Sequence, residues 1–272
     1  MAGRVAEKIA LVTGAARGMG RSHAVKLAAE GADVIVVDIC AQVATVQYPL
    51  ASPEDLDETV RLVAETGRRA IGVQADVRDL EQLRSGVDGA VAELGGLDIV
   101  VANAGICVAA PWDRITPEIM RDTIDTNLIG AWNTVMAGAG HLVRRGGGSI
   151  VLISSAAGLK LQPFMVPYMA SKFGVTGMAK AFAAELAKDG IRVNSVHPTG
   201  VDTPMGSGGG LMTAINAGIE ANPRLGVAFT NMLPVEQIEA ADVSNAVLFL
   251  ASEESRQITA LAMAVDAGVT QM

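Results

Sequence analysis

The sequence predicts an α/β fold in which helices flank a doubly wound, seven-stranded parallel sheet within a single domain of 272 residues. Short apolar runs alternate with helical patterns, and runs such as 34–37 are continuously hydrophobic, as is typical of strands buried on both faces. Hydrophobic residues make up 50% of the chain, enough for one full core. The expected strands are 8–12, 33–38, 70–75, 98–102, 148–154, 191–196 and 261–266, and the expected helices are 18–30, 54–66, 79–94, 117–145, 165–189 and 239–252.

A glycine-rich turn joins the first strand to the first helix and is typical of a dinucleotide site. Gly14 permits the tight turn, and Gly18 lets the backbone approach phosphates without a Cβ in the way. Gly20 lets the helix pack closely on the sheet. The free N–H groups and the dipole at the helix start favour a bound diphosphate.

The second strand ends in an acidic residue that favours NAD over its phosphorylated form. Asp38 follows Gly14 by 24 residues, about where a carboxylate binds the ribose hydroxyls, and its charge repels a 2′-phosphate. Arg17 acts in the opposite sense, because an arginine in the glycine turn can neutralise such a phosphate. Since Ile39 adds no second positive charge, we predict NAD as the cofactor.

Two later helices begin with clear signals, and two segments interrupt the alternation. Residues 52–55 and 116–118 each combine an N-cap, a first-turn proline and an acidic residue. Residues 39–53 form an unusually long connection after the second strand, an insertion in the expected fold. Residues 199–234, rich in Gly, Met and Pro, predict a flexible apolar loop that serves as a substrate lid. The alternative for residues 39–53 is a surface excursion without effect on the cofactor, and the alternative for residues 199–234 is a disordered insertion.

A candidate catalytic pair lies on the helix expected at 165–189. Tyr168 and Lys172 are four residues apart and so share one helix face. A lysine ammonium and an oxidised nicotinamide both favour the phenolate, which suits a base that takes a proton from an alcohol. Ser155, at the end of the preceding strand, is placed to bind the substrate oxygen, and strand alternation points Ser154 the other way. Asn127 is placed to orient the lysine through a water.

This set of motifs resembles the classical short-chain dehydrogenase/reductase family over almost the whole chain. The resemblance implies a Rossmann fold, the catalytic tetrad Asn127, Ser155, Tyr168 and Lys172, and hydride transfer between nicotinamide and an alcohol or carbonyl carbon. It also implies that Asp76 contacts the adenine. The cofactor-binding residues that it implies are Gly14, Arg17, Gly18, Met19, Gly20, Asp38, Asp76, Val77, Asn103, Ala104, Gly105, Tyr168, Lys172, Pro198, Gly200, Val201 and Thr203.

The chain departs from the family pattern at two places. Ala102 stands where the family often has a second asparagine, although Asn103 is retained. Residues 197–200 read His-Pro-Thr-Gly instead of the commoner Asn-Pro-Gly. His197 suggests a substrate contact, but a histidine after a strand and before a proline is more often structural.

The chain is similar to a carveol-dehydrogenase-like branch of the family from actinobacteria at residues 38–40, 48–51, 53–56, 196–198 and 202–205. Members of this branch are often linked with the redox peptide mycofactocin and are thought to hold NAD so tightly that it does not exchange. An insertion beside the adenine could cover the cofactor in this way. The resemblance therefore implies that the purified protein retains NAD and needs another electron acceptor.

The substrate and the oligomeric state are less strongly specified. The expected lining is nearly all apolar, which indicates a hydrophobic secondary alcohol or its ketone, such as a terpenoid or another alicyclic alcohol. Small residues on the helices at 117–145 and 165–189 favour close packing between subunits, and the family resemblance implies a homotetramer. The expected lining residues are Ala104, Gly105, Ile106, Cys107, Val108, Ala156, Phe164, Met165, Met205, Leu211, Met212 and Met232.

Composition excludes several other classes. The net charge of −8 argues against a nucleic-acid partner, and the two isolated cysteines fit no metal site. Residues 1–8 lack the apolar core of a signal peptide and no stretch suits a bilayer helix, so we expect a cytoplasmic protein. The competing functions are a non-catalytic NAD-binding regulator and a sugar-nucleotide epimerase. Few residues follow Pro198, which disfavours the epimerase because such enzymes usually have a larger C-terminal substrate domain.

Overall fold

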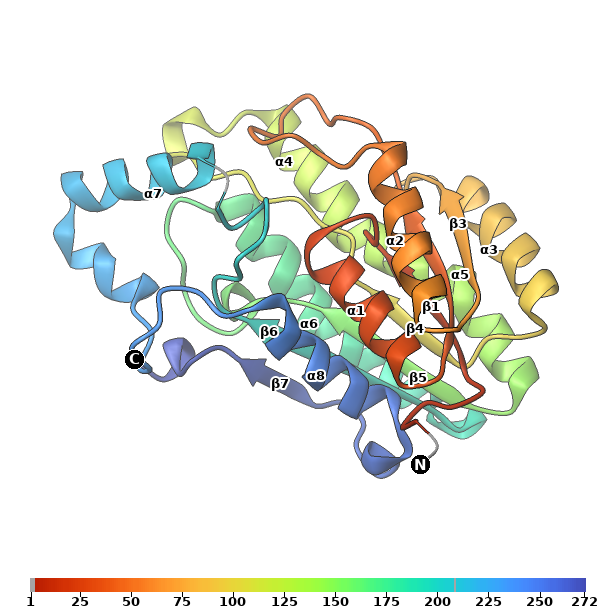
Figure 1. Ribbon diagram of the computed structural model, residues 1–272. Helices are drawn as coiled ribbons and strands as arrows, with labels where there is room; N and C mark the ends of the chain where they lie inside the picture. The colour runs from red at the N-terminus through yellow and green to blue at the C-terminus, as the bar shows by residue number, and fades with distance from the viewer. Residues whose placement is uncertain (1–2, 208) are drawn as a thin grey trace.

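The computed structural model describes residues 3–207 and 209–272 and contains the predicted parallel sheet (Figure 1). The strand order is β3-β2-β1-β4-β5-β6-β7, and every pairing is parallel. The doubly wound, seven-stranded fold is therefore confirmed. The strands are β1 Ile9–Thr13, β2 Asp33–Asp38, β3 Ala70–Gln74, β4 Ile99–Ala102, β5 Gly148–Ile153, β6 Ile191–Pro198 and β7 Ala262–Val265.

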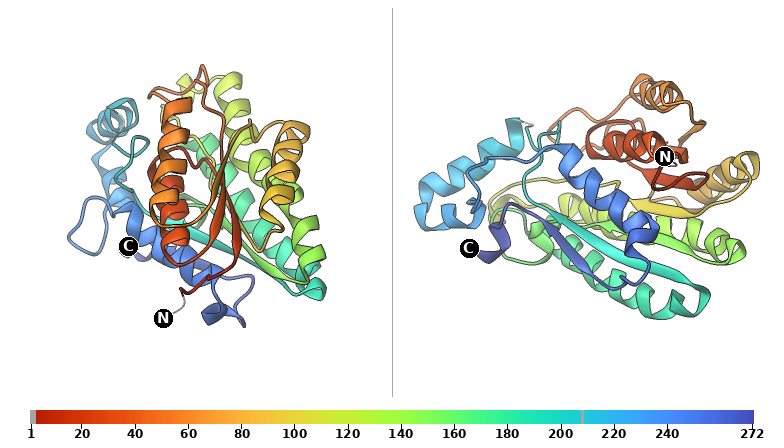
Figure 2. Two further views of the ribbon diagram at one scale, coloured as in Figure 1. Left: turned by 45° about the vertical axis from the view of Figure 1, so that its right-hand side comes forward. Right: turned by 60° about the horizontal axis from the view of Figure 1, so that its bottom comes forward.

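Helices cover both faces of the sheet, as the two views of Figure 2 show. One layer contains α1 (Gly18–Ala29), α2 (Pro53–Glu65) and α8 (Ala240–Ala251). The other contains α3 (Leu80–Leu94), α5 (Gly130–Arg145) and α6 (Val166–Leu186), with α4 (Pro117–Ile124) running into α5. Two apolar clusters fill the spaces between the sheet and these layers, so the core lies on both sides of the strands.

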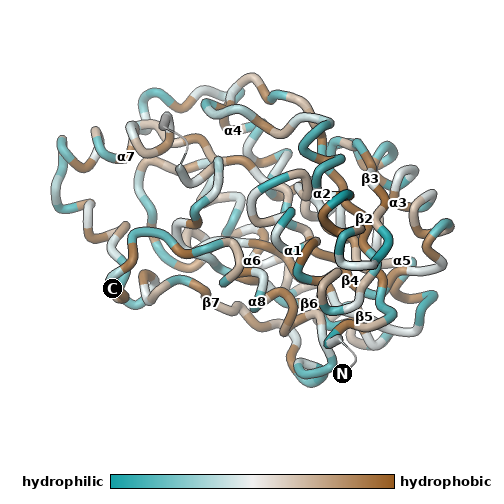
Figure 3. Tube along the Cα trace, viewed as in Figure 1, coloured by the Kyte–Doolittle hydropathy of each residue, from teal (hydrophilic) through white to brown (hydrophobic). Residues whose placement is uncertain are grey.

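The predicted helix starts form as the sequence indicates. Ser52 accepts a hydrogen bond from the backbone N–H of Asp55 at 3.3 Å, and the Asp55 carboxylate accepts one from the Ser52 N–H at 2.9 Å. Thr116 caps α4 through the N–H of Ile119. Loss of such a cap typically lowers the free energy of unfolding by about 1 kcal/mol. Figure 3 shows hydrophilic residues along much of α2, whereas the neighbouring β2 is hydrophobic, which agrees with their positions outside and inside the core.

The helix expected over 117–145 is interrupted in its middle. Residues Asp125–Ile129 form a turn of π-helix between α4 and α5. Wider turns of this kind often lie at functional sites. Asn127 lies within this turn and is buried, so the irregular backbone is where a candidate catalytic residue is placed.

The sheet changes winding direction between β1 and β4. From β1 the chain proceeds to β2 and β3 on one side, whereas β4 to β7 extend on the other. In open α/β sheets, ligands bind outside the carboxyl ends of the strands at this switch point. In Figure 1, α7 (Gly209–Ala221) lies beyond these carboxyl ends at the left, and the loop that follows β2 arches at the top.

The expectation of a loop throughout residues 199–234 was wrong in part. The structure forms α7 there, followed by a 3₁₀ segment over Pro223–Phe229. Glycines at the start of α7 hide its periodicity, but Leu211 and Ile215 are four residues apart and both are buried. They pack with Cys107 and Met165, and burial of this apolar face stabilises the helix.

No helix in the described part of the chain is both long and apolar enough to cross a bilayer.

A buried histidine between α1 and α8 predicts acid sensitivity of the fold. His23 is fully buried, its Nδ1 lies 2.8 Å from Ser244 Oγ, and burial lowers its pKa to about 3. Below about pH 6.5, His23 therefore binds a proton in the unfolded chain but stays neutral in the folded protein. The free energy of unfolding falls as the pH falls. Between pH 7 and pH 5 this group should remove about 2 kcal/mol from the free energy of unfolding.

Urea unfolding at pH 7 and pH 5, on the wild type and His23→Gln, measures this contribution. The wild type should lose about 2 kcal/mol more than the variant over this interval, because the carboxylates titrate in both. An equal loss in the two proteins would contradict the assignment.

Candidate active site

The glycine turn at the carboxyl end of β1 leaves room for a ligand at the N-terminus of α1. Gly14 and Gly18 have φ of +65° and +54°, which favour glycine. A Cβ on Gly20 would lie 2.0 Å from the carbonyl oxygen of Gly14, so the helix and turn pack as closely as predicted. The first N–H groups of the helix therefore face the cleft without side chains in the way.

Asp38 is held beside this turn at the end of β2. Its two carboxylate oxygens accept hydrogen bonds from the N–H groups of Ala16 at 3.0 Å and Cys40 at 3.2 Å. Burial raises the pKa of Asp38, and these hydrogen bonds oppose that rise. The carboxylate is thus fixed in the cleft, where adenosine ribose hydroxyls can reach it.

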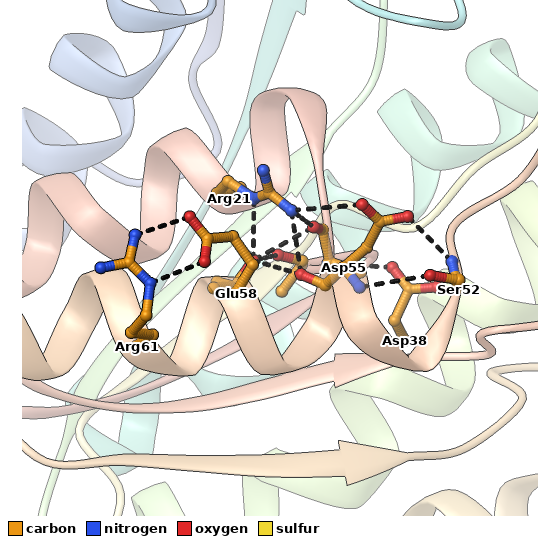
Figure 4. A network of polar contacts seen from close by, with 9 residues as sticks. Arg21, Asp38, Ser52, Asp55, Glu58 and Arg61 are labelled. Carbon is orange, nitrogen blue, oxygen red and sulfur yellow. Dashed lines mark hydrogen bonds and ion pairs between the residues drawn. The ribbon is translucent and has the colours of Figure 1, made fainter.

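Arg21 connects the glycine turn to α2 (Figure 4). Its guanidinium donates to the carbonyl oxygen of Asp55 at 2.9 Å and to Thr59 Oγ1 at 3.0 Å, and it also donates to the carbonyl oxygen of Ala16. The start of α2 is thereby fixed against the turn. The chain between β2 and α2 must span this short distance, so residues 39–52 arch over the cleft.

Residues 39–52, called the strap below, are bound to the rest of the protein at several points. Arg17 donates a hydrogen bond to the carbonyl oxygen of Pro49, and Thr45 donates one to Asp122 at 2.7 Å. Tyr48 is buried, and its hydroxyl accepts a hydrogen bond from the N–H of Cys107 at 3.2 Å. The Arg17 side chain therefore binds the strap, a role that the sequence did not predict.

Most of the expected cofactor residues line one cleft between the glycine turn and the strap. The cleft contains Gly14, Arg17, Gly18, Met19, Gly20, Asp38, Asp76, Val77, Asn103, Ala104, Gly105 and Thr203. Pro198, Gly200, Val201 and Tyr168 line an adjoining cavity of about 650 Å³, and Met19 and Thr203 line both spaces. The cleft residues that the sequence analysis did not assign include Ile39, Val43, Tyr48, Leu50, Arg78 and Thr126.

Two buried polar atoms in the cleft have no partner among the described residues. Asn103 donates to the carbonyl oxygens of Thr13 and Gly14 at 2.9 and 3.2 Å, but its own Oδ1 has no partner. Thr126 Oγ1 is also unpaired. Buried polar atoms usually have partners, so these two fit a ligand that carries hydroxyl and amino groups. The cleft therefore fits a dinucleotide by shape and chemistry.

Ser155, Tyr168 and Lys172 come together where β5 and α6 border the cavity. Ser155 and Tyr168 both line the cavity and share a side-chain hydrogen bond. Lys172 Nζ lies 5.4 Å from the centroid of the Tyr168 ring and donates to the carbonyl oxygen of Ile153 at 2.9 Å. Ser154 also lines the cavity, but its hydroxyl donates to the carbonyl oxygen of Lys172 at 3.0 Å and so holds α6.

The electrostatics of this pair differ from the simple expectation. Burial raises the pKa of Tyr168, and the hydrogen bond with Ser155 only partly opposes that rise. Burial also lowers the pKa of Lys172 to about 8. Near neutral pH the protein alone therefore keeps the phenol protonated, and the phenolate needs positive charge close to it.

Asn127 lies beside Lys172 without a direct hydrogen bond to it. Its side chain accepts from the N–H of Ile106 at 2.8 Å and donates to the carbonyl oxygen of the same residue at 2.9 Å. It also donates to Ser171 Oγ at 3.1 Å. Asn127 thus fixes the segment after β4 against α6, and its proposed link to Lys172 through a water stays a prediction.

His197 lies behind the cavity wall. It is fully buried, with Nδ1 2.9 Å from the carbonyl oxygen of Ser155 and Nε2 2.8 Å from Ser195 Oγ. A carbonyl oxygen only accepts, so Nδ1 carries the proton and Nε2 accepts from the serine. His197 therefore supports the backbone of Ser155.

The expected substrate lining is present in part. Cys107, Met165, Met205, Leu211 and Met212 line the cavity, together with Ile215 and Phe229, which the sequence analysis did not name. Ala104, Gly105 and Ile106 line the cofactor cleft instead. Val108, Ala156, Phe164 and Met232 line neither space. Phe164 instead packs against Gly218 of α7, and Met232 packs against Gly268 in the C-terminal segment.

Comparisons with known proteins point to one family. The short chain dehydrogenase model matches residues 8–209. The chain is 48% identical to a (−)-trans-carveol dehydrogenase from Rhodococcus erythropolis, over 98% of this chain and 99% of that protein.

Two similar crystal structures cover nearly the whole chain. One is a short chain dehydrogenase from Mycobacterium paratuberculosis bound to NAD, with 54% identity and a TM-score of 0.97, covering 99% of this chain and 100% of that chain. The other is a carveol dehydrogenase from Mycobacterium avium in complex with NAD, with 46% identity, a TM-score of 0.94 and the same coverage. The similarity therefore includes the cleft, the cavity and the strap.

Proposed function

The chain belongs to the short-chain dehydrogenase family, and from that premise we propose that it interconverts a hydrophobic secondary alcohol and its ketone with NAD. One observation carries the proposal: Ser155 and Tyr168 line a cavity that adjoins the dinucleotide cleft, and Lys172, which lines neither space, has its Nζ 5.4 Å from the centroid of the Tyr168 ring. An alcohol in the cavity can thus contact an acid–base group and lie beside the cofactor-binding residues Pro198 and Val201.

The chain's own residues divide the binding of NAD between them. The helix start after Gly14 would bind the diphosphate, Asp38 would accept hydrogen bonds from the adenosine ribose, and Asp76 would contact the adenine edge. Lys172, whose Nζ lies 5.4 Å from the centroid of the Tyr168 ring, would bind the nicotinamide ribose, and residues 198–203 would hold the nicotinamide. When bound, NAD supplies the acceptor for the hydride that leaves the alcohol carbon.

Ser155 and Tyr168 carry the proton chemistry. The Ser155 hydroxyl binds the substrate oxygen, and Tyr168 takes the hydroxyl proton as the alcohol becomes a ketone. In reduction, Tyr168 returns the proton to the same oxygen. Because burial raises the pKa of Tyr168, this exchange depends on nearby positive charge, which protonated Lys172 provides together with the oxidised nicotinamide ring.

The cavity favours a neutral, hydrophobic substrate such as a terpenoid or another alicyclic alcohol. Its walls are built from Met165, Leu211, Ile215 and Phe229. Among the described lining residues there is no lysine, arginine or histidine, so an anionic substrate finds no counter-ion. Carveol-like specificity is proposed from this apolar wall and from the carveol dehydrogenase relative.

The strap supports tight retention of NAD. Its residues Ile39, Val43, Tyr48 and Leu50 line the cleft, so its contacts must open before a dinucleotide can leave. We therefore propose that the bound NAD exchanges slowly and is reoxidised in place by another acceptor, for which the redox peptide mycofactocin is the candidate.

Exposed apolar side chains support a homotetramer. Trp132 and Met136 on α5 and Val166 and Phe173 on α6 are exposed in the single chain. Pairing of these helices between subunits would cover them. The cytoplasmic location stays a prediction from the sequence.

The function is tested by mass spectrometry of the cofactor released from purified protein and by turnover of a panel of hydrophobic secondary alcohols with a dye acceptor. We expect NAD in the protein and dye reduction that depends on the alcohol. Retained NAD without turnover of any alcohol would favour the competing function, a non-catalytic NAD-binding regulator.

A further inference from the structure

Two amide side chains line the cavity in addition to the polar groups at its reacting side. Gln162 lies on the loop between Ser155 and Tyr168, and Asn216 lies on α7, which forms the outer wall beyond the carboxyl ends of the strands (Figure 1). Both residues line the cavity. Ser155, at the end of β5, and Tyr168, on α6, define the reacting side.

The amides of Gln162 and Asn216 differ from the other polar groups of the cavity because they have no hydrogen-bond partner within the described part of the chain. Thr199 is bonded to Asn231, Ser207 to Asp202 and Gln237 to the carbonyl oxygen of Gly206. Only the exposed carboxylate of Glu236 is similarly uncommitted among the described lining residues. Asn216 is exposed and Gln162 is half-buried, so both amides are free to bind a ligand.

Apolar side chains lie between α7, which carries Asn216, and the reacting residue Tyr168. Met165, Leu211 and Ile215 are buried in one cluster, and Phe229 and Tyr168 pack against it. A substrate that reaches from Tyr168 to the outer wall must therefore present hydrocarbon along its length. At the amides, by contrast, hydrocarbon would displace water without replacing its hydrogen bonds.

We propose that the substrate is an alicyclic alcohol with a second, uncharged hydrogen-bonding group, a hydroxyl or carbonyl, which Gln162 and Asn216 bind at the outer end of the cavity. An amide offers both a donor and an acceptor, so either group is suitable. A carboxylate is disfavoured, because Glu236 is the only charged residue among the described lining residues. This inference rests on the proposed alcohol–ketone function and specifies its substrate class.

Two matched pairs of alcohols, one short and one long, test whether the protein prefers a substrate with a second polar group. The pairs are cyclohexane-1,4-diol with 4-methylcyclohexanol, and 4-(2-hydroxyethyl)cyclohexanol with 4-propylcyclohexanol, each as the trans isomer, with trans-4-hydroxycyclohexanecarboxylate as the anionic probe. In the wild type, the diol of at least one pair should have a kcat/KM about fivefold to tenfold higher than its hydrocarbon partner. The carboxylate should be the poorest substrate of its length.

Three variants assign the preference to the amides. Gln162→Leu and Asn216→Leu should each reduce the preference for the diol, and the double variant should abolish it by lowering kcat/KM for the diol. Gln257→Leu is the control, because Gln257 is exposed and lies outside the cavity lining. Equal kcat/KM values within both wild-type pairs, or a preference that survives in the double variant, would overturn the inference.

A binding measurement separates this inference from the proposed function. The diol 1,4-dimethylcyclohexane-1,4-diol and its hydrocarbon partner 1,4,4-trimethylcyclohexanol carry only tertiary hydroxyls and cannot be oxidised to ketones, and calorimetry on the purified protein gives their affinities. Tighter binding of the diol-type ligand by about fivefold to tenfold, lost in the double variant, supports the outer polar site even if no alcohol is turned over. Equal affinities overturn the site whatever the turnover assay shows.

Discussion

Tyr168→Phe should retain its NAD and lose alcohol oxidation by a factor of about 10² to 10⁴. The substitution removes the only phenol that lines the cavity beside Ser155 among the described residues, and a positioned acid–base group typically contributes this much to the rate. The ring remains, so packing against Met165 and Leu211 should be preserved. The rate of dye reduction with a secondary alcohol measures the loss, and mass spectrometry measures the retained cofactor.

Tyr48→Phe is the matched control for this variant. It removes a phenolic hydroxyl that bonds the N–H of Cys107 and lies outside the reacting pair. Its turnover should stay within about tenfold of the wild type, because one neutral hydrogen bond is worth about 1 kcal/mol. Turnover of Tyr168→Phe within tenfold of the wild type would remove Tyr168 from the proton step.

Tyr48→Ala should release NAD about 10² times faster than the wild type. Tyr48 is buried and packs with Val43, Val46 and Ile106, so truncation removes the central side chain of the strap cluster. Deleting a buried aromatic side chain costs about 3 kcal/mol or more, and every 1.4 kcal/mol changes an equilibrium about tenfold. The population of the open state of the strap should therefore rise about 10²-fold, and the rate of NAD release should rise with it. Exchange of bound NAD for isotope-labelled NAD, followed by mass spectrometry, gives the rate.

Two further variants make this a graded test. Tyr48→Phe keeps the packing, and Thr45→Val removes one hydrogen bond to Asp122. Each should accelerate exchange by no more than about tenfold. If Tyr48→Ala exchanges NAD as slowly as the wild type, the strap does not control the retention of NAD. It would then be a surface segment that has no effect on cofactor exchange.

The sheet and its helices were predictable because local and tertiary preferences agree. Runs such as Val34–Val37 have only one suitable environment, the interior of a sheet covered on both faces, and the structure places them in β2. Helix starts at Ser52 and Thr116 are encoded within four residues. Helix α7 was missed because its stability comes from burying Leu211 and Ile215 against Cys107 and Met165, residues distant in the sequence.

The candidate site was predictable in its residue types but not in its energetics. The spacing of Tyr168 and Lys172 places them on one helix face in the structure. The rise in the pKa of Tyr168 was not predictable, because it arises from burial beneath segments that are far away in the chain. The same holds for the contact of Arg17 with the strap: Arg17 lines the cleft, as expected of a cofactor-binding residue, and it also donates to Pro49, which depends on the path of the strap.

The most direct test of the whole account is to mix the purified protein, without added cofactor or dye, with a neutral secondary alcohol and to follow the near-ultraviolet absorbance of reduced nicotinamide. The account predicts a single rapid rise that corresponds to about one reduced cofactor per site and that is absent in Tyr168→Phe. If no alcohol of the panel changes the absorbance while NAD is present in the protein, the cleft and cavity do not form an alcohol-oxidising site.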